Sequence, residues 1–148
     1  MLEDFISSTS WTTKKLQIQL SFIEVLDELV ESFMEFHDDL PLSYRDEQFA
    51  RHLLWRIEDN HKDFTLLFKR GADPLEFSTF WVHLMPYITG VFPESILPYD
   101  KILVFFSEKI YVIVHDLIAF HISSFDELIE QVVELINDTR KQYDAENE

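Results

Sequence analysis

The amino-acid sequence predicts a mainly α-helical fold, a compact bundle of about five to six helices. Only two glycines, Gly71 and Gly90, occur among the 148 residues, whereas a protein of many hairpins needs more residues that tolerate positive φ. Hydrophobic residues recur at three- and four-residue spacing over long segments, which is the period of amphipathic helices. Apolar residues make up 47 % of the chain, so residues 1–148 are expected to form a single globular domain with one core.

The first long helix is expected from about Thr13 to Asp39, and Pro41 ends the helical pattern. Residues 1–12, which include a small polar run at 7–10, are expected to form an irregular or short helical lead-in. The apolar face of this helix is formed by Phe22, Leu26, Leu29, Phe33 and Phe36.

Ser43 is the expected N-cap of a second helix. Asp46 and Glu47 follow in its first turn, where carboxylates interact favourably with the helix dipole. The apolar face of this helix continues toward residue 57, and a break is expected near Asn60.

Glycine and proline mark the ends of the elements that follow. Gly71 has the position of a C′ residue after a helix that ends in two basic residues. The pair Asp73-Pro74 is expected to supply the N-cap and first residue of the next helix, which Pro86 kinks or ends. Residues 91–99 contain two prolines and are expected to be a connector.

Residues 101–122 fit two secondary structures. Their β-branched and aromatic residues suit a β-hairpin that turns at Ser107-Glu108-Lys109, which would make the fold α+β. Their polar residues instead recur near a seven-residue period, which favours a helix that Asp100 would cap. The helix is preferred. Charged residues interrupt this apolar window, so it is not expected to span a membrane.

The last helix is the most clearly marked. Ser124 is the expected N-cap, and Glu127 three residues later completes a capping box. Residues 144–148 are expected to be a frayed acidic tail.

The charge composition excludes several classes of partner. The chain has 28 acidic and 12 basic residues, a formal net charge of −16. A direct nucleic-acid binder needs a basic surface, and an anionic membrane repels an acidic one. The sequence has no cysteine, hence no disulfide and no thiolate metal site, and its acidic N-terminus shows no secretory signal. A cytoplasmic location is therefore expected.

Two predicted helices carry rows of carboxylates without interleaved cations. No lysine or arginine lies between Lys15 and Arg45, or between Lys109 and Arg140. Side chains three and four residues apart share one helix face. The first candidate partner-binding set is Glu24, Glu28, Glu31, Glu35, Asp38 and Asp39. The second set is Asp126, Glu127, Glu130 and Glu134, with Asp138 continuing the row.

No catalytic motif, cofactor or metal site is predicted. The sequence lacks a glycine-rich phosphate loop and the common hydrolase and metalloprotease signatures, so a non-enzymatic role is expected. The spacing of Glu58 and His61 matches half of a di-iron motif whose second half is missing. The run His37-Asp38-Asp39 offers only a weak divalent site. The aromatic residues Trp11, Tyr44 and Tyr143 are expected to be exposed.

These features predict a module that binds and neutralises a basic protein, as immunity proteins and antitoxins do to nuclease toxins. One alternative is a mimic of nucleic acid that blocks a DNA- or RNA-binding enzyme. Five carboxylates over fourteen residues give about one charge per 5 Å, so the mimic needs two acidic helices side by side. The other alternative is a small helical regulator or scaffold that binds through an apolar groove. The sequence leaves open whether the acidic helices share a face and whether the protein is a monomer or homodimer.

Overall fold

The computed structural model describes residues 2–36, 39–90 and 99–146, and in these ranges it contains no β-strand. The chain forms a helical bundle, which confirms the predicted fold class. Its helices are α1 (Leu2–Phe36), α2 (Leu42–Asp59), α3 (His61–Lys69), α4 (Pro74–Trp81), α5 (Met85–Thr89), α6 (Tyr99–His115) and α7 (Phe125–Glu146). A 3₁₀ turn, Val82–Leu84, joins α4 to α5, and a π-helical turn, Asp116–Phe120, follows α6.

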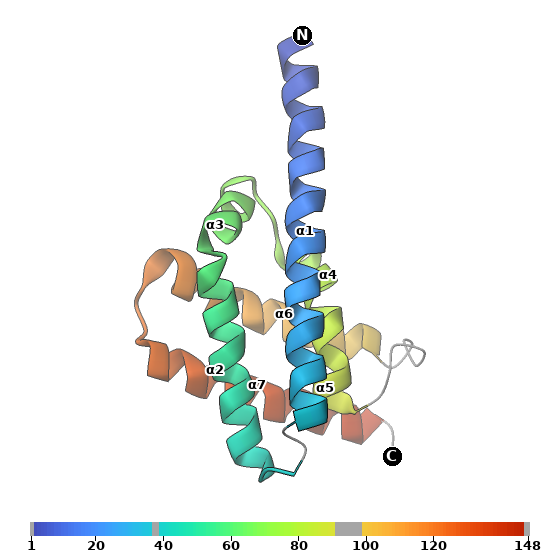
Figure 1. Ribbon diagram of the computed structural model, residues 1–148, viewed down its shortest axis with the longest axis vertical. Helices are drawn as coiled ribbons and strands as arrows, with labels where there is room; N and C mark the ends of the chain where they lie inside the picture. The colour runs from blue at the N-terminus through green and yellow to red at the C-terminus, as the bar shows by residue number, and fades with distance from the viewer. Residues whose placement is uncertain (1, 37–38, 91–98, 147–148) are drawn as a thin grey trace.

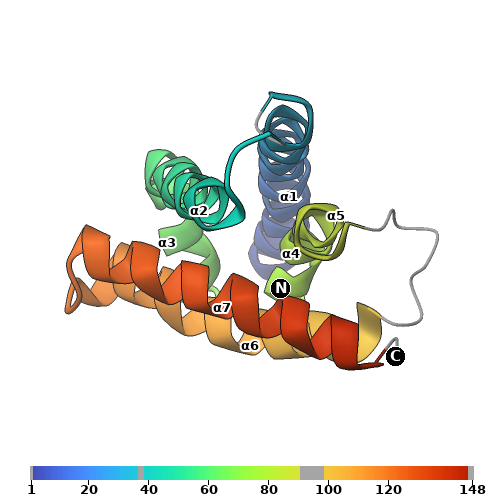
Figure 2. The same cartoon turned by 90° about the horizontal axis from the view of Figure 1, so that it is seen from below.

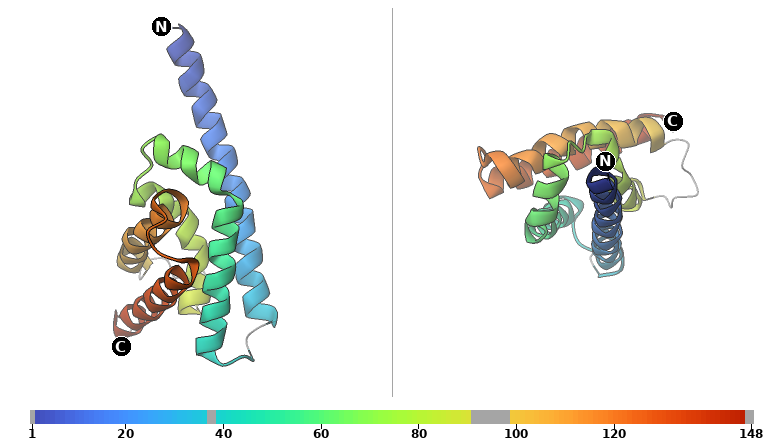
Figure 3. Two further views of the ribbon diagram at one scale, coloured as in Figure 1. Left: turned by 90° about the vertical axis from the view of Figure 1, so that its left-hand side faces the viewer. Right: turned by 90° about the horizontal axis from the view of Figure 1, so that it is seen from above.

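The bundle has two layers of helices that cross. Helices α1 and α2 pack side by side, and the first turns of α1 project beyond the rest of the molecule (Figure 1, Figure 3). Helices α6 and α7 pack against each other and run across the other side of the molecule (Figure 2). Helices α4 and α5 lie between the layers, where α4 packs on α6 and α5 packs on α7.

An aromatic cluster fills the centre of the core. The Phe22 ring from α1 forms edge-to-face pairs with Phe64 and Phe80, with ring centroids 4.9 and 5.3 Å apart. Phe77 and Trp81 extend the cluster toward α6, and all five side chains are buried. Edge-to-face aromatic pairs of this kind are worth about 0.5–1.5 kcal/mol beyond the area that they bury.

Helix α1 begins much earlier than expected. Residues 2–12, expected to form an irregular or short helical lead-in, are part of one continuous helix that runs from Leu2 to Phe36. Serine and threonine cost only a few tenths of a kcal/mol each in a helix, so an established helix propagates through them. Trp11, expected to be exposed, is partly buried against the core, and the Arg70 guanidinium lies 4.8 Å from its ring centroid.

Helix α2 also begins differently. Ser43 is not the N-cap: Pro41 holds that position, and the Arg45 amide donates to the Pro41 carbonyl over 2.9 Å. Asp46 and Glu47 were expected in the first turn, but α2 has no acidic residue there; Asp46 lies one turn further along and is buried. The break near Asn60 is confirmed, because α2 ends at Asp59.

The predicted helix ends around α4 are confirmed. Gly71 has φ +80°, the left-handed conformation that a C′ residue requires. The Glu76 amide donates to Asp73 Oδ1 over 2.9 Å, which confirms Asp73 as an N-cap. Pro86 stands at the start of α5, just after the 3₁₀ turn that ends α4. The expected connector 91–99 lies outside the described residues up to 98, and Tyr99 already belongs to α6.

Residues 101–120 are helical, so the hairpin alternative is excluded. Ile102, Phe106, Ile110 and Val114 recur every four residues and are buried, and α6 packs against α4 and α7. The many β-branched and aromatic residues, which would also suit a strand, are thus explained by a helix that α4 and α7 cover on two sides. Asp100 lies in the first turn of α6.

Asp116 stabilises the connection between α6 and α7 through hydrogen bonds from backbone amides. Its carboxylate accepts from the amides of Ile122, over 2.7 Å, and Ser123. Burial alone would raise the pKa of this carboxyl, but the hydrogen bonds from Ser123 and Ile122 together outweigh burial, so the pKa is lowered overall. His121 has φ +53°, which ends the π-helical turn.

Ser124 is the N-cap of α7, as expected, and its hydroxyl exchanges hydrogen bonds with Glu127. The Glu127 amide donates to Ser124 Oγ, and that hydroxyl donates to the Glu127 carboxylate, both over 3.2 Å. Helix α7 continues through residues 144–146. Within the described ranges, no helix is long and apolar enough to cross a lipid bilayer.

Candidate protein-binding site

The acidic row of α1 faces away from the core. Glu24, Glu28, Glu31 and Glu35 are all exposed, and they lie on the side of the helix opposite the buried Leu26. Asp39 is exposed in the turn after the helix, whereas Asp38 lies outside the described residues. This face of α1 is therefore open to a partner.

The acidic row of α7 is exposed as well, but it borders another helix. Asp126, Glu130 and Glu134 are exposed and follow one another at four-residue spacing. Asp138 is the next residue of the row and is half-buried. Glu127 lies beside them and takes part in the N-terminal cap.

The two rows do not share a face. Helices α2 and α5 each pack against both α1 and α7 and lie between them, and α1 and α7 run in crossing directions (Figure 2). The side-by-side arrangement that nucleic-acid mimicry needs is therefore not formed by these two helices.

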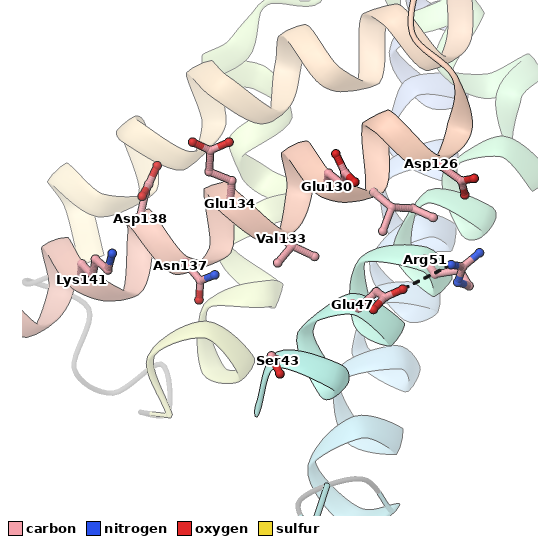
Figure 4. Close-up of a pocket in the computed structure, with 11 residues that line it drawn as sticks. Ser43, Glu47, Arg51, Asp126, Glu130, Val133, Glu134, Asn137, Asp138 and Lys141 are labelled. Atoms are coloured by element: carbon pink, nitrogen blue, oxygen red, sulfur yellow. Dashed lines mark ion pairs between the residues drawn. The ribbon is translucent and has the colours of Figure 1, made fainter. Parts of the chain in front are cut away.

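A groove of about 850 Å³ separates α7 from the first half of α2 (Figure 4). Its lining residues are Ser43, Glu47, Arg51, Asp126, Ile129, Glu130, Val133, Glu134, Asn137, Asp138 and Lys141. Ile129 and Val133 give it an apolar floor, the first buried and the second half-buried. The groove thus combines apolar surface with a rim of charge.

The charge of the groove is negative. Five of the lining residues are carboxylates and two, Arg51 and Lys141, are cations. Arg51 is engaged within the groove, because its Nη2 lies 3.6 Å from the Glu47 carboxylate (Figure 4). The groove therefore presents an excess of carboxylates to any occupant.

A buried ion pair holds the two walls of the groove together. Arg140 of α7 donates to both oxygens of the Asp46 carboxylate of α2, over 2.9 and 3.1 Å. Its Nε also donates to the Ile88 carbonyl, over 3.0 Å, and the Tyr87 hydroxyl donates to Asp46 over 2.7 Å. This network ties α2, α5 and α7 together.

The network shifts the protonation equilibria of its members. Burial and the hydrogen bond to Asp46 raise the pKa of the Tyr87 hydroxyl. Burial alone would lower the pKa of Arg140, but the hydrogen bonds and charge of Asp46 raise it. Both Tyr87 and Arg140 therefore keep their protons at neutral pH.

An aromatic pair, of which Trp55 is exposed and Phe125 half-buried, lies beside residues at one end of the groove. The indole of Trp55 on α2 is 44 % exposed, and its ring stacks on Phe125 with centroids 6.2 Å apart. The Arg51 guanidinium lies 5.9 Å from the Trp55 ring centroid. Arg51 and Asp126, the neighbour of Phe125 in sequence, both line that end of the groove.

Sequence reasoning missed much of this site. The sequence places Glu47 only in the first turn of a helix, and it gives no signal for Trp55, which lies within a regular helical pattern. Of the aromatic residues expected to be exposed, Tyr44 is, whereas Trp11 and Tyr143 are partly buried against the core. The one sequence signal for the groove is the four-residue spacing of acidic residues on α7.

The candidate metal ligands are also placed. Glu58 and His61 are both exposed, and His61 Nδ1 lies 3.2 Å from the Glu58 backbone carbonyl. His37 and Asp38 belong to the undescribed residues. Elsewhere in the described chain, no three His, Asp or Glu side chains are grouped as metal ligands would be.

Comparisons of this chain with models of protein families, with curated proteins and with solved structures find no match.

Proposed function

We propose that this chain is a non-enzymatic acidic protein that binds and neutralises a basic protein, in the manner of an immunity protein or antitoxin against a nuclease toxin. The observation that carries the proposal is the exposure of two rows of carboxylates, on α1 and α7, with no lysine or arginine interleaved in either row. A nuclease is a fitting target because its substrate site must be basic.

The rows have an energetic cost that favours a function for them. Glu24, Glu28, Glu31 and Glu35 form three like-charged pairs at three- or four-residue spacing. Each such pair destabilises a helix by about 0.2–0.5 kcal/mol, so the row costs about 0.6–1.5 kcal/mol. Interleaved lysines would remove this cost and are absent.

The physical benefit is fast and selective encounter. A one-signed surface attracts partners of opposite charge and repels those of the same charge. Because the two rows lie on different sides of the molecule, a basic partner is attracted over a wide range of approach directions.

The proposal is tested with a partner captured from a lysate of the protein's own source. The tagged chain is incubated with nuclease-treated lysate at about 0.1 M salt, where the Debye length is about 10 Å, and eluted with a salt step. A basic protein released by salt is expected, and adding this chain should inhibit its nuclease activity.

Charge reversal then tests the mechanism. Glu28→Lys with Glu31→Lys should slow association with the captured partner and reduce its dependence on salt. The matched control is Glu58→Lys with Asp59→Lys, which changes the same charge at the exposed end of α2. Equal association rates for the wild type and both variants would contradict electrostatic docking.

A further inference from the structure

The groove between α2 and α7 has the length of a short helix. From Asp126 to Lys141 the groove wall spans fifteen residues, about 22 Å at 1.5 Å per residue. Along it, Asp126, Glu130, Glu134 and Asp138 recur every fourth residue, so a carboxylate stands about every 6 Å. A helix turn rises about 5.4 Å, so a helical partner with one cation per turn can match this spacing.

The aromatic pair at the end of the groove is a second and independent feature. Tryptophan is among the residues that most often dominate binding energy at protein interfaces, where it packs in a desolvated centre. Trp55 is 44 % exposed although it stacks on Phe125, so one part of the indole is already fixed and another is free to be covered. Holding the ring in place beforehand lowers the entropy cost of binding.

Charge selects the occupant. The carboxylates of the groove outnumber its cations by five to two, which disfavours an acidic segment. The floor of Ile129 and Val133 and the nearby Trp55 ring need apolar side chains to cover them. A segment with basic residues on one face and apolar residues on the other satisfies both requirements.

We infer that the α2–α7 groove seats an amphipathic basic helix of the partner, with an apolar side chain of that helix packed on Trp55. This inference rests on the proposed function and makes it specific. The exposed row on α1 serves encounter, whereas the groove sets how long the complex lasts.

The probe is a synthetic amphipathic peptide of 18 residues, with leucine on one face and lysine on the other. Two matched peptides carry glutamate or glutamine in place of every lysine. Binding of each labelled peptide to the full-length chain is measured by fluorescence anisotropy at about 0.1 M salt. The lysine peptide should bind, and replacing lysine by glutamine should weaken binding about tenfold or more, equivalent to about 1.4 kcal/mol.

Two double reversals separate the groove from the row on α1. Glu130→Lys with Glu134→Lys changes two groove carboxylates, and Glu24→Lys with Glu28→Lys changes two on α1. Both pairs have four-residue spacing on an exposed helix face, and both change the net charge equally. We expect the groove pair to weaken peptide binding at least about tenfold, and the α1 pair less than about threefold.

Trp55 supplies a test that does not depend on charge. Trp55→Ala should weaken binding of the lysine peptide about tenfold, while Val112→Ala, at a position 66 % exposed on α6, should leave it unchanged. Trp55→Phe retains a ring on Phe125 and should recover most of the affinity. Circular dichroism and thermal unfolding check that each variant is folded.

The outcomes distinguish the inference from the function that it refines. The groove inference is overturned if the lysine peptide fails to bind, or if both double reversals weaken its binding equally. Capture of a basic partner and inhibition of that partner would still support the proposed function. If the glutamine peptide binds as tightly as the lysine peptide, the groove takes an apolar occupant. If the glutamate peptide binds best, both proposals fail.

Discussion

Replacing Arg140 by methionine should destabilise the protein strongly, because it leaves a buried carboxylate without its cation. Asp46 is 1 % exposed, so water cannot replace the guanidinium freely. Methionine has a similar length and keeps much of the packing, so Arg140→Met removes mainly the charge and its hydrogen bonds. After the change, the Tyr87 hydroxyl still donates to Asp46.

The size of the effect follows from the geometry. Arg140 donates three hydrogen bonds, two to Asp46 and one to the Ile88 carbonyl. Removing one partner of a buried ion pair costs about 3–5 kcal/mol. The Arg140 side chain is 19 % exposed, which places the expected loss near the lower end, about 3 kcal/mol. For a chain of this size that corresponds to a fall in Tm of about 6–12 °C.

Urea unfolding followed by far-UV circular dichroism measures the loss. The matched comparison is a triple variant in which Asp46→Leu and Tyr87→Phe accompany Arg140→Met, so that no charge or hydroxyl of the network remains. Apolar replacement of a whole buried pair is often neutral, so the triple variant should regain at least half of the lost free energy. A loss below about 1 kcal/mol for Arg140→Met would refute the reasoning, as would a triple variant no more stable than the single one.

Two further predictions concern titration and helix capping. The pKa of Tyr87 is raised in the folded state, whereas an unfolded tyrosine ionises near pH 10, so the folded state retains a proton that the unfolded state loses. Stability should therefore fall as pH rises above about 10, by up to about 1.4 kcal/mol per pH unit for this group. In urea unfolding between pH 9 and 11, the free energy of unfolding should decline less steeply with pH for Tyr87→Phe than for the wild type. Some decline should remain, because the pKa of Tyr111 is also raised. An unchanged slope would show that Tyr87 is not responsible. Asp73→Ala should cost about 1 kcal/mol because it removes the cap of α4, whereas Ser43→Ala, which caps nothing, should be near neutral. Equal losses for these two variants in thermal unfolding would contradict the assignment of the caps.

The features predicted correctly are those that a few neighbouring residues determine. Asp73-Pro74, Gly71 and Ser124 act on the backbone within three or four residues of themselves, and all three occur as expected. The helical spacing of charge on α1 and α7 likewise placed the described carboxylates of both sets on the surface. The sequence therefore predicts a feature correctly where the residues that interact lie within one helical turn of each other.

The features that were missed depend on partners far along the chain. Asp46 looked like a first-turn carboxylate, but its cation lies 94 residues away, on α7. The burial of residues 101–120 on two sides, which makes them helix rather than hairpin, depends on α4 and α7. The groove also depends on distant partners, because Glu47 lies beside the α7 carboxylates, and Trp55 beside Phe125, only after α2 and α7 have packed.

The buried ion pair supports the proposed binding of a helix in the groove, because it fixes how α2 and α7 pack. Asp46 and Glu47 are adjacent on α2, and Arg140 and Lys141 are adjacent on α7; in each pair one residue points inward and the next lines the groove. Apolar contacts alone would let the two helices slide by small steps, whereas two hydrogen bonds from one planar guanidinium to one carboxylate fix their register. The carboxylates of the rim therefore keep their spacing before any partner arrives. A rim that is already ordered loses less entropy on binding, so more of the interaction with a basic helix is realised as affinity.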